Sequence, residues 1–436
     1  MPRATADGVI TTMSPHPHQV DIARTIDAVW RMESARVIGS LTRIVRDVGL
    51  AEELAQDALV AALEKWPVDG VPDNPGAWLT TTARNRAIDR LRHLRLREEK
   101  HVQVAWELEQ LQEDVSAREE QLLDDTVGDD VLRLMFIACH PVLPQESRVA
   151  LTLRLLGGLE TGEIARAFLA NETAIAQRIV RAKRTLAEAK VPFEIPRREE
   201  LPERLSAVLG VVYLVFNEGY AASSGDDWMR PALCEEALRL GRVLAGLMPD
   251  EPEVHGLVAL MEIQASRLHA RSGPDGEPVL LMEQDRSRWD RLLIGRGLDA
   301  LEQVRRLGGE SGFYALQAAI AACHARAVVP EDTDWARIVG LYDALARLTG
   351  SPVVELNRAV AVSMAQGPAA ALPLVDALLD EPKLASYHLL PSVRGDLLFR
   401  LGRLEEARAE FERAATMTGN ARERGLLLAR AGRCPI

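Results

Sequence analysis

The strongest candidate for chemistry in this sequence is a basic helix behind a tight turn, in the segment Leu151–Ala189. A first helix ends at Gly157-Gly158, a short helix begins at Thr161, and Asn171 can cap the next helix. That helix has an apolar face made of Ile175, Ile179, Ala182 and Leu186. Its other face carries Thr173, Gln177, Arg178, Arg181 and Arg184. The pattern predicts a helix-turn-helix that presents polar groups to base edges and arginines to phosphates.

A second candidate helix, Asn74–Arg97, is also basic on its outer face. Pro75 suits its first turn, where the missing N–H costs little. The predicted inner stripe comprises Trp78, Leu79, Ala83, Ala87, Ile88 and Leu91. The outer face carries Arg84, Asn85, Arg92 and Arg95. Arginine, asparagine and threonine on a helix can hold phosphates and unpaired bases, as recognition of a single strand requires.

A third helix, Val48–Trp66, precedes these and is amphipathic. Its apolar positions are Leu50, Leu54, Ala58 and Leu63, and its polar surface is formed by Glu52, Glu53, Gln56 and Asp57. In isolation such a surface is ordinarily a solvated helix face.

The elements that position these residues are predicted to be helices throughout, so the expected fold class is all-α. Aromatic residues make up 4% of the 436 residues, and alanine, leucine, arginine and glutamate dominate, which favours helices. The net charge of −12 argues against a globally basic nucleic-acid binder but permits local basic surfaces.

Composition also narrows the class of protein. The four cysteines are far apart and fit no disulfide or zinc spacing, which predicts a reducing cytoplasm. We expect no signal peptide, because the segment Met1–Pro17 is polar and has no apolar run flanked by basic residues. We expect no membrane span, because no apolar run approaches about 20 residues. No phosphate-binding loop, zinc-protease or nucleophile-elbow motif is present, so we expect no enzyme activity, catalytic residue, metal or cofactor.

Proline and charge divide the chain into five expected parts. Two small helical domains span residues 21–97 and 129–190, the second containing the helix-turn-helix. An acidic linker, 98–128, joins them, and it is either a mimic of nucleic acid or a plain tether. A proline-rich linker, 191–202, leads to a helical-repeat array at 203–436.

The array is inferred from an internal repeat near the C-terminus. Ala361–Leu379 and Asp396–Ala414 align at an offset of 35 residues when Gly367 is matched to Gly402. Each unit is predicted to be a helix, a turn and a helix, similar to a tetratricopeptide repeat. Leu233–Leu260 is a weaker relative. Such pairs must stack to bury their apolar faces.

The three helices, taken in order, resemble a known family. An acidic amphipathic helix ending in Lys65-Trp66, a Trp-Leu-x-x-x-Ala-Arg-Asn helix, a charged linker and a helix-turn-helix are typical of extracytoplasmic-function sigma factors. The resemblance covers about residues 21–191. The segments Ile137–Ala170, Val211–Asp227 and Gln284–Asp290 are similar to the subgroup with a large tetratricopeptide-like extension.

The resemblance implies that the protein binds core RNA polymerase and promoter DNA and directs promoter-specific initiation. It places the polymerase contact at Leu54, Gln56, Asp57 and Trp66. It places the −10 contact at Arg84, Asn85, Asp89, Arg90 and Arg92, with a flipped base received by the loop 67–74. It places the −35 contact at Thr173, Gln177, Arg178, Arg181 and Arg184. Two positions weaken these lists: Ala176 stands where many such helices carry a basic residue, and Asp89 can instead pair with Arg92 or Arg86.

The segment Phe216–Asp227 is the expected ligand or interdomain loop of the extension, with Asn217, Glu218 and Tyr220 as its polar residues. Two readings stay open: small-molecule sensing, or intramolecular docking of the extension on the sigma domains.

Two other functions also remain open. A helix-turn-helix regulator with a sensory repeat domain would bind duplex operators without polymerase. A scaffold whose repeats recruit proteins would depend on neither DNA nor polymerase.

Overall fold

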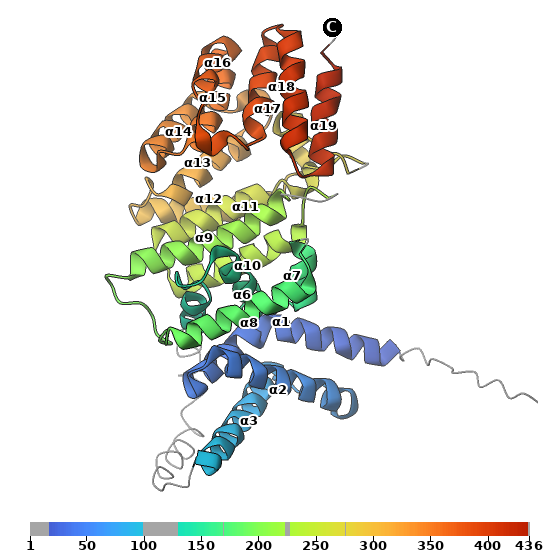
Figure 1. Cartoon of the computed structure of the whole chain (residues 1–436), viewed down its shortest axis with the longest axis vertical. Helices are drawn as coiled ribbons and strands as arrows, with labels where there is room; N and C mark the ends of the chain where they lie inside the picture. Colours follow the sequence, from blue (N-terminus) through green and yellow to red (C-terminus); the bar gives the residue numbers. More distant parts are fainter. Residues whose placement is uncertain (1–16, 99–129, 169, 223–226, 275, 435–436) are drawn as a thin grey trace, which may run out of the picture. The chain divides into compact units, whose positions relative to one another are not determined.

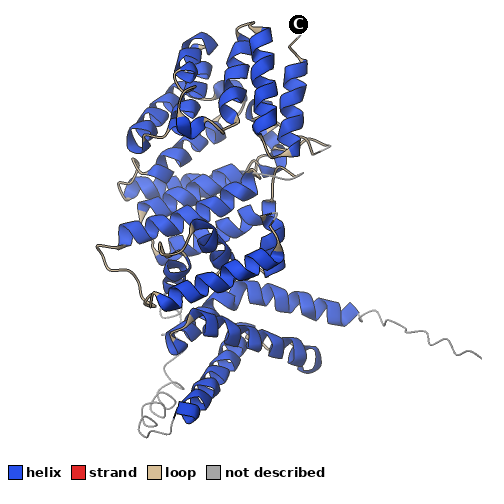
Figure 2. Ribbon diagram, in the orientation of Figure 1, coloured by secondary structure: helices blue, strands red, loops and turns tan. Residues whose placement is uncertain are grey.

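The computed structural model describes residues 17–98, 130–168, 170–222, 227–274 and 276–434. Within these ranges every named element is a helix and no β-strand occurs, which confirms the all-α prediction (Figure 2). The acidic linker predicted at 98–128 lies almost wholly outside the described residues. The chain divides into two compact units, residues 1–138, 150–160 and 178–196 in the first, and 139–149, 161–177 and 197–436 in the second.

The first unit is built on three helices, α1 (Pro17–Val45), α2 (Val48–Asp69) and α3 (Pro75–Glu98), labelled in Figure 1. Each of these helices packs against the other two. A stripe of fully buried alanines lets the backbones approach closely: Ala51, Ala55, Ala58 and Ala62 on α2, and Ala83 and Ala87 on α3. The backbone N–H of Leu50 donates to Asp47 Oδ1 at 2.7 Å, which fixes the start of α2.

A further helical stretch at 130–138 is joined to α1 through a buried carboxylate. Asp130 is fully buried, and its two oxygens pair with Arg43 Nε at 3.3 Å and Arg133 Nη1 at 2.8 Å. Two cationic partners compensate for removing this charge from water.

Three more helices form the helix-turn-helix region: α6 (Gln145–Leu155), α7 (Thr161–Ala167) and α8 (Glu172–Glu188). Gly158 follows α6 with a φ of 65°, a left-handed conformation that favours glycine. A Cβ at this position would also lie 3.0 Å from Ser34 Oγ of α1. The predicted break at Gly157-Gly158 is therefore confirmed.

The second unit contains the extension, in which consecutive helices pack against each other. Its α-helices are α9 (Leu201–Tyr220), α10 (Pro231–Leu247), α11 (Pro252–Ala265), α12 (Arg291–Arg306), α13 (Phe313–Arg326), α14 (Trp335–Thr349), α15 (Pro352–Gln366), α16 (Pro368–Asp376), α17 (Leu389–Arg400), α18 (Leu404–Met417) and α19 (Ala421–Gly432). Short 3-10 helices are η1 (Leu268–Ala270), η2 (Leu281–Glu283), η3 (Arg286–Arg288), η4 (Pro330–Asp332) and η5 (Pro382–Leu384).

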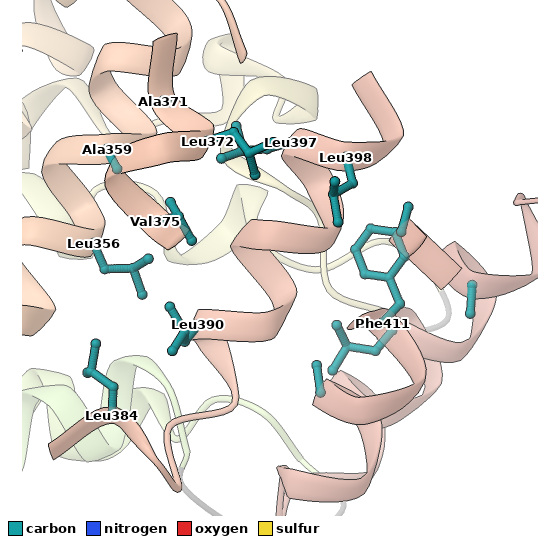
Figure 3. Close-up of a cluster of buried hydrophobic side chains, with 14 of the residues drawn as sticks. Leu356, Ala359, Ala371, Leu372, Val375, Leu384, Leu390, Leu397, Leu398 and Phe411 are labelled. Carbon is teal, nitrogen blue, oxygen red and sulfur yellow. The ribbon is translucent and has the colours of Figure 1, made fainter. Parts of the chain in front are cut away.

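The repeat found in the sequence is present as two helix pairs. α15 and α16 meet at Gly367 with a φ of 93°, and α17 is separated from α18 by a turn containing Gly402, with a φ of 77°. These pairs share one apolar core, which includes Leu356, Val375, Leu390, Leu398 and Phe411 (Figure 3). Stacking of the pairs thus buries faces that neither pair could bury alone.

Two predicted loops begin later than expected. Pro67 does not end α2, which continues to Asp69, so the loop before α3 consists of residues 70–74. The loop expected at Phe216–Asp227 is also wrong at its start, because α9 continues to Tyr220. In α2 the buried Trp66 anchors the last turn although Pro67 to Asp69 are exposed, and in α9 Gly219 packs against Cys234.

Candidate nucleic-acid interface

Helix α8 has the two faces that its sequence predicts. Ile175, Ile179, Ala182 and Leu186 are all buried. The turn before the helix is closed by Asn171, whose Oδ1 accepts from the backbone N–H of Thr173 at 2.8 Å. The apolar stripe fixes the helix rotation, so the opposite face is presented outward.

That outward face carries most of the predicted −35 residues. Thr173, Gln177, Arg181 and Arg184 are exposed, whereas Arg178 is half-buried. Arg184 Nε donates to Glu188 Oε1 at 2.6 Å, and this hydrogen bond raises the pKa of the guanidinium. Arg184 is thus already paired within the helix, and exposed pairs of this kind are weak enough to exchange for a phosphate. Ala176 is half-buried and adds no charge.

Helix α3 carries all five predicted −10 residues, most of them exposed. Asn85, Asp89, Arg90 and Arg92 are exposed, and Arg84 is half-buried. Of the predicted inner stripe, Leu79, Ala83 and Ala87 are buried, while Trp78, Ile88 and Leu91 are half-buried. Asp89 Oδ1 lies 3.9 Å from Arg92 Nη1, so this carboxylate partly neutralises the positive charge of the exposed surface of α3. Arg95, also expected on the outer face, lies on α3, but its side chain falls outside the part of the chain that the structure describes.

Asn74 organises the loop that leads into α3. Its Oδ1 accepts from the backbone N–H of Ala77 at 3.0 Å, and Gly70 takes a φ of 88° at the other end of the loop. The loop 70–74 is mostly exposed beside the start of α3.

The four residues of α2 that were predicted to contact the polymerase differ in exposure. Leu54 and Trp66 are buried, with exposed fractions of 4% and 1%, and the Trp66 ring packs edge-to-face on Trp78 with centroids 5.4 Å apart. They belong to the core of the first unit because their apolar area is removed from water there. Gln56 is half-buried and Asp57 is exposed, 3.9 Å from Arg86 Nη1.

Glu52 is the residue that the sequence pattern misplaced. It was expected on the acidic surface of α2, but it is 3% exposed. Its carboxylate accepts from Arg154 Nε at 2.7 Å and from Gln56 Nε2 at 2.7 Å, and it also pairs with Lys183 Nζ. Arg154 in turn donates to the Leu159 carbonyl at 3.1 Å. The carboxylate therefore ties α2 to α6, α8 and the turn after α6.

The polar residues expected in the extension loop lie instead on the last turn of α9. Glu218 pairs with Arg230 Nη1, and the Tyr220 hydroxyl accepts from Arg267 Nη2 at 2.7 Å. Burial raises the pKa of Tyr213, and the Asn217 side chain opposes that shift. All three are half-buried and serve the interior of the extension.

No group of three histidine, cysteine or acidic side chains suited to a metal occurs among the described residues. No helix in those same ranges is both long and apolar enough to cross a membrane. The four cysteines are free and buried.

Comparison with protein families agrees with the three helical regions. Residues 29–97 match sigma-70 region 2, and residues 133–186 match sigma-70 region 4. Residues 204–305 match a family of unknown function, DUF6596.

Relatives of two kinds are found. R00370 of Rhizobium meliloti, an uncharacterised protein, is 46% identical over 402 residues, which are 91% of this chain and 93% of that protein. The probable ECF RNA polymerase sigma factor SigI of Mycobacterium tuberculosis is 26% identical over 171 residues, 39% of this chain and 57% of its own. The ECF RNA polymerase sigma factor SigK of Mycobacterium ulcerans is 30% identical over 155 residues, 35% of this chain and 78% of its own. No solved structure matches the chain.

Proposed function

Because this chain belongs to the extracytoplasmic-function sigma factors and carries a helical C-terminal extension, we propose that it binds core RNA polymerase through α2, the −10 element through α3 and the −35 element through α8. A sigma factor directs transcription initiation at promoters, and catalysis belongs to the polymerase. The cytoplasm is the compartment that this function requires.

The observation that carries the proposal is the exposed face of α8. Four predicted contact residues are exposed opposite a fully buried apolar stripe. Thr173 and Gln177, near the helix N-terminus, suit base edges, while Arg181 and Arg184 suit phosphates farther along. A guanidinium that reaches a phosphate releases a counterion, so its contribution depends on salt.

The −10 contact is assigned to α3 and the loop 70–74. Asn85, Arg90 and Arg92 lie exposed on one helix, and the loop is held open to solvent between Gly70 and Asn74. Polar and cationic groups beside an open loop can hold a displaced strand and accept an unstacked base.

The polymerase contact is assigned to the exposed part of α2. Asp57 and the neighbouring exposed acid Glu53 supply its charge, and Gln56 supplies a half-buried amide. Leu54 and Trp66 support this face from beneath and fix the rotation of α2.

Two roles are proposed for the extension: it controls the activity of the sigma regions, or it supports that activity, through intramolecular contacts. Chemical cross-linking of the full-length protein with and without core polymerase tests for such contacts. Cross-links between the extension and α2, α3 or α8 that change when core polymerase is added would support them, and their absence in both states would overturn them.

Reconstituted transcription tests the sigma assignment. The full-length protein is added to sigma-free core polymerase on pooled genomic promoter fragments, beside the variants Arg181→Ala and Arg305→Ala. Arg305 is exposed on α12 and serves as the matched control. We expect initiation from a defined promoter class, a loss of initiation for Arg181→Ala, and a salt slope of binding reduced by about 1. If the protein alone shifts duplex DNA without core polymerase, it is an operator-binding regulator instead.

A further inference from the structure

A partly open cavity inside the extension takes no part in the proposed promoter contacts. A cavity of about 470 Å³ lies among α9, α11, α13, α14 and α15, wholly within the second unit. This volume is in the range of sites for small organic molecules. Aromatic rings form part of its wall: Phe216 and Tyr220 of α9 are stacked at 5.7 Å between centroids, and α14 contributes Tyr342.

The charge on the cavity wall is unbalanced. The described residues that line the cavity include no aspartate or glutamate, and among them Arg267 carries the positive charge. Arg267 is 9% exposed, and its hydrogen-bond partners in the described chain are the Tyr220 hydroxyl at 2.7 Å and Gln264 Oε1, both neutral. Buried charges are ordinarily paired with an opposite charge.

Two further buried arginines lie behind the same wall. Arg271 places its guanidinium 3.5 Å from the Tyr220 ring centroid and donates to the Tyr220 carbonyl. Arg286 donates to the carbonyls of His324 and Ala327, each at 2.8 Å. Neither forms an ion pair with a carboxylate in the described part of the chain. Burial lowers the pKa of Arg271 to about 10, and the charge of Arg267 contributes to the lowering.

His324 adds a polar group that is buried in the cavity lining. It is 9% exposed and packs edge-to-face on Trp335, with centroids 5.1 Å apart. Its Nδ1 has no hydrogen-bond partner among the residues that the structure describes. Burial, together with the charges of Arg267 and Arg286, lowers the pKa of this ring to about 4, so it is neutral at pH 7. A neutral imidazole can donate to a ligand or accept from it.

We propose that this cavity binds a small organic anion, a molecule that joins one carboxylate, phosphate or sulfonate group to a planar apolar body. Arg267 pairs with the anionic group, the rings of Phe216, Tyr220 and Tyr342 enclose the planar body, and His324 hydrogen-bonds to a polar atom of the ligand. The volume excludes a folded partner, and the excess positive charge disfavours cations. Binding of such an anion is separate from promoter recognition, so it can be measured without transcription.

The test uses a pair of fluorescent probes that differ in charge. The anion is 8-anilinonaphthalene-1-sulfonate, and N-phenyl-1-naphthylamine is the same ring system without the sulfonate. Each is titrated into the full-length protein at low salt, and stoichiometry is measured by calorimetry. We expect one saturable site that prefers the anionic probe by about 10-fold or more, since a hydrogen-bonded charge pair is worth about 1.5–3 kcal/mol.

Two variants separate the cavity from adventitious binding. Arg267→Met is expected to lower the affinity for the anionic probe by about 10- to 100-fold and to leave the affinity for the neutral probe unchanged. Arg305→Met, on the surface, should change neither affinity. Ala321→Phe is expected to abolish binding of both probes without altering any charge, because Ala321 is buried in the cavity lining and a phenyl ring there would fill the space. Circular dichroism melting establishes that each variant is folded.

Three results would overturn the proposal. The first is equal affinity of the wild-type protein for the two probes. The second is an Arg267→Met variant that behaves like Arg305→Met. The third is a folded Ala321→Phe variant that still binds the anionic probe, because the probe would then occupy another surface.

Discussion

The carboxylate of Glu52 offers the sharpest test of how the first unit is held together. The Glu52 side chain is 5% exposed, and those of its partners Arg154 and Lys183 are 20% and 22% exposed. Removing one member of a buried ion pair costs about 3–5 kcal/mol because the remaining charge is uncompensated. The partners here are partly hydrated, so we expect Glu52→Gln to cost about 2–4 kcal/mol. Glutamine keeps the volume, so no cavity contributes.

Hydrogen exchange followed by mass spectrometry resolves this loss within the chain. Peptides covering α2, α6 and the turn after α6 should exchange about 30- to 1,000-fold faster in Glu52→Gln, the equivalent of that free energy. Glu53→Gln is the matched control, because Glu53 is the adjacent acid and is exposed. The control should change stability by less than about 0.5 kcal/mol.

A double-mutant cycle with Arg154→Met isolates the pair itself. The two changes should be non-additive, because both remove the same interaction. Equal exchange in Glu52→Gln and Glu53→Gln would refute the reasoning, since a buried, doubly paired carboxylate would then contribute no more than a solvated one.

Three further predictions concern the extension. Gly219→Ala should lower stability by about 1–3 kcal/mol, because the new Cβ would lie 2.7 Å from the Cys234 backbone nitrogen. Gly210→Ala, on the same helix, meets nothing within 4 Å and should raise stability by about 0.5–1 kcal/mol. The two variants should shift the melting temperature in opposite directions, and shifts of the same sign would contradict the prediction. Asn420→Ala should lower the free energy of unfolding in urea by about 2–3 kcal/mol, because Asn420 is 1% exposed, caps α19 and donates to two backbone carbonyls. A loss below about 0.5 kcal/mol would argue against these hydrogen bonds. The folded pKa of His324, about 4, lies below its usual 6.5, so the unfolded chain gains the proton first as pH falls. Stability should therefore drop between pH 6.5 and 4, by about 2 kcal/mol at pH 5 from this residue, and His324→Gln should flatten that dependence in urea titrations; an unchanged pH slope would show that the ring is not buried neutral.

The sequence by itself determined the local elements of this protein. The apolar spacing of Ile175, Ile179, Ala182 and Leu186 predicted both the existence and the rotation of α8, because a helix repeats every 3.6 residues whatever it packs against. Asn171 and Gly158 were predicted as helix boundaries because capping and left-handed conformations depend on a few neighbouring atoms. The turns at Gly367 and Gly402 in the repeat were predicted because glycine adopts the left-handed conformation that each turn needs.

Tertiary structure alone decided which polar and apolar groups are buried and with whom. Periodicity marks an apolar face but does not say what covers it, so Trp66 was expected on a contact surface and lies in the core. The partner of Glu52 on α6 is 102 residues away in sequence, and the cavity joins Tyr213 to Asn357. Pairing and enclosure of this kind depend on where distant helices meet, and no local pattern encodes that position.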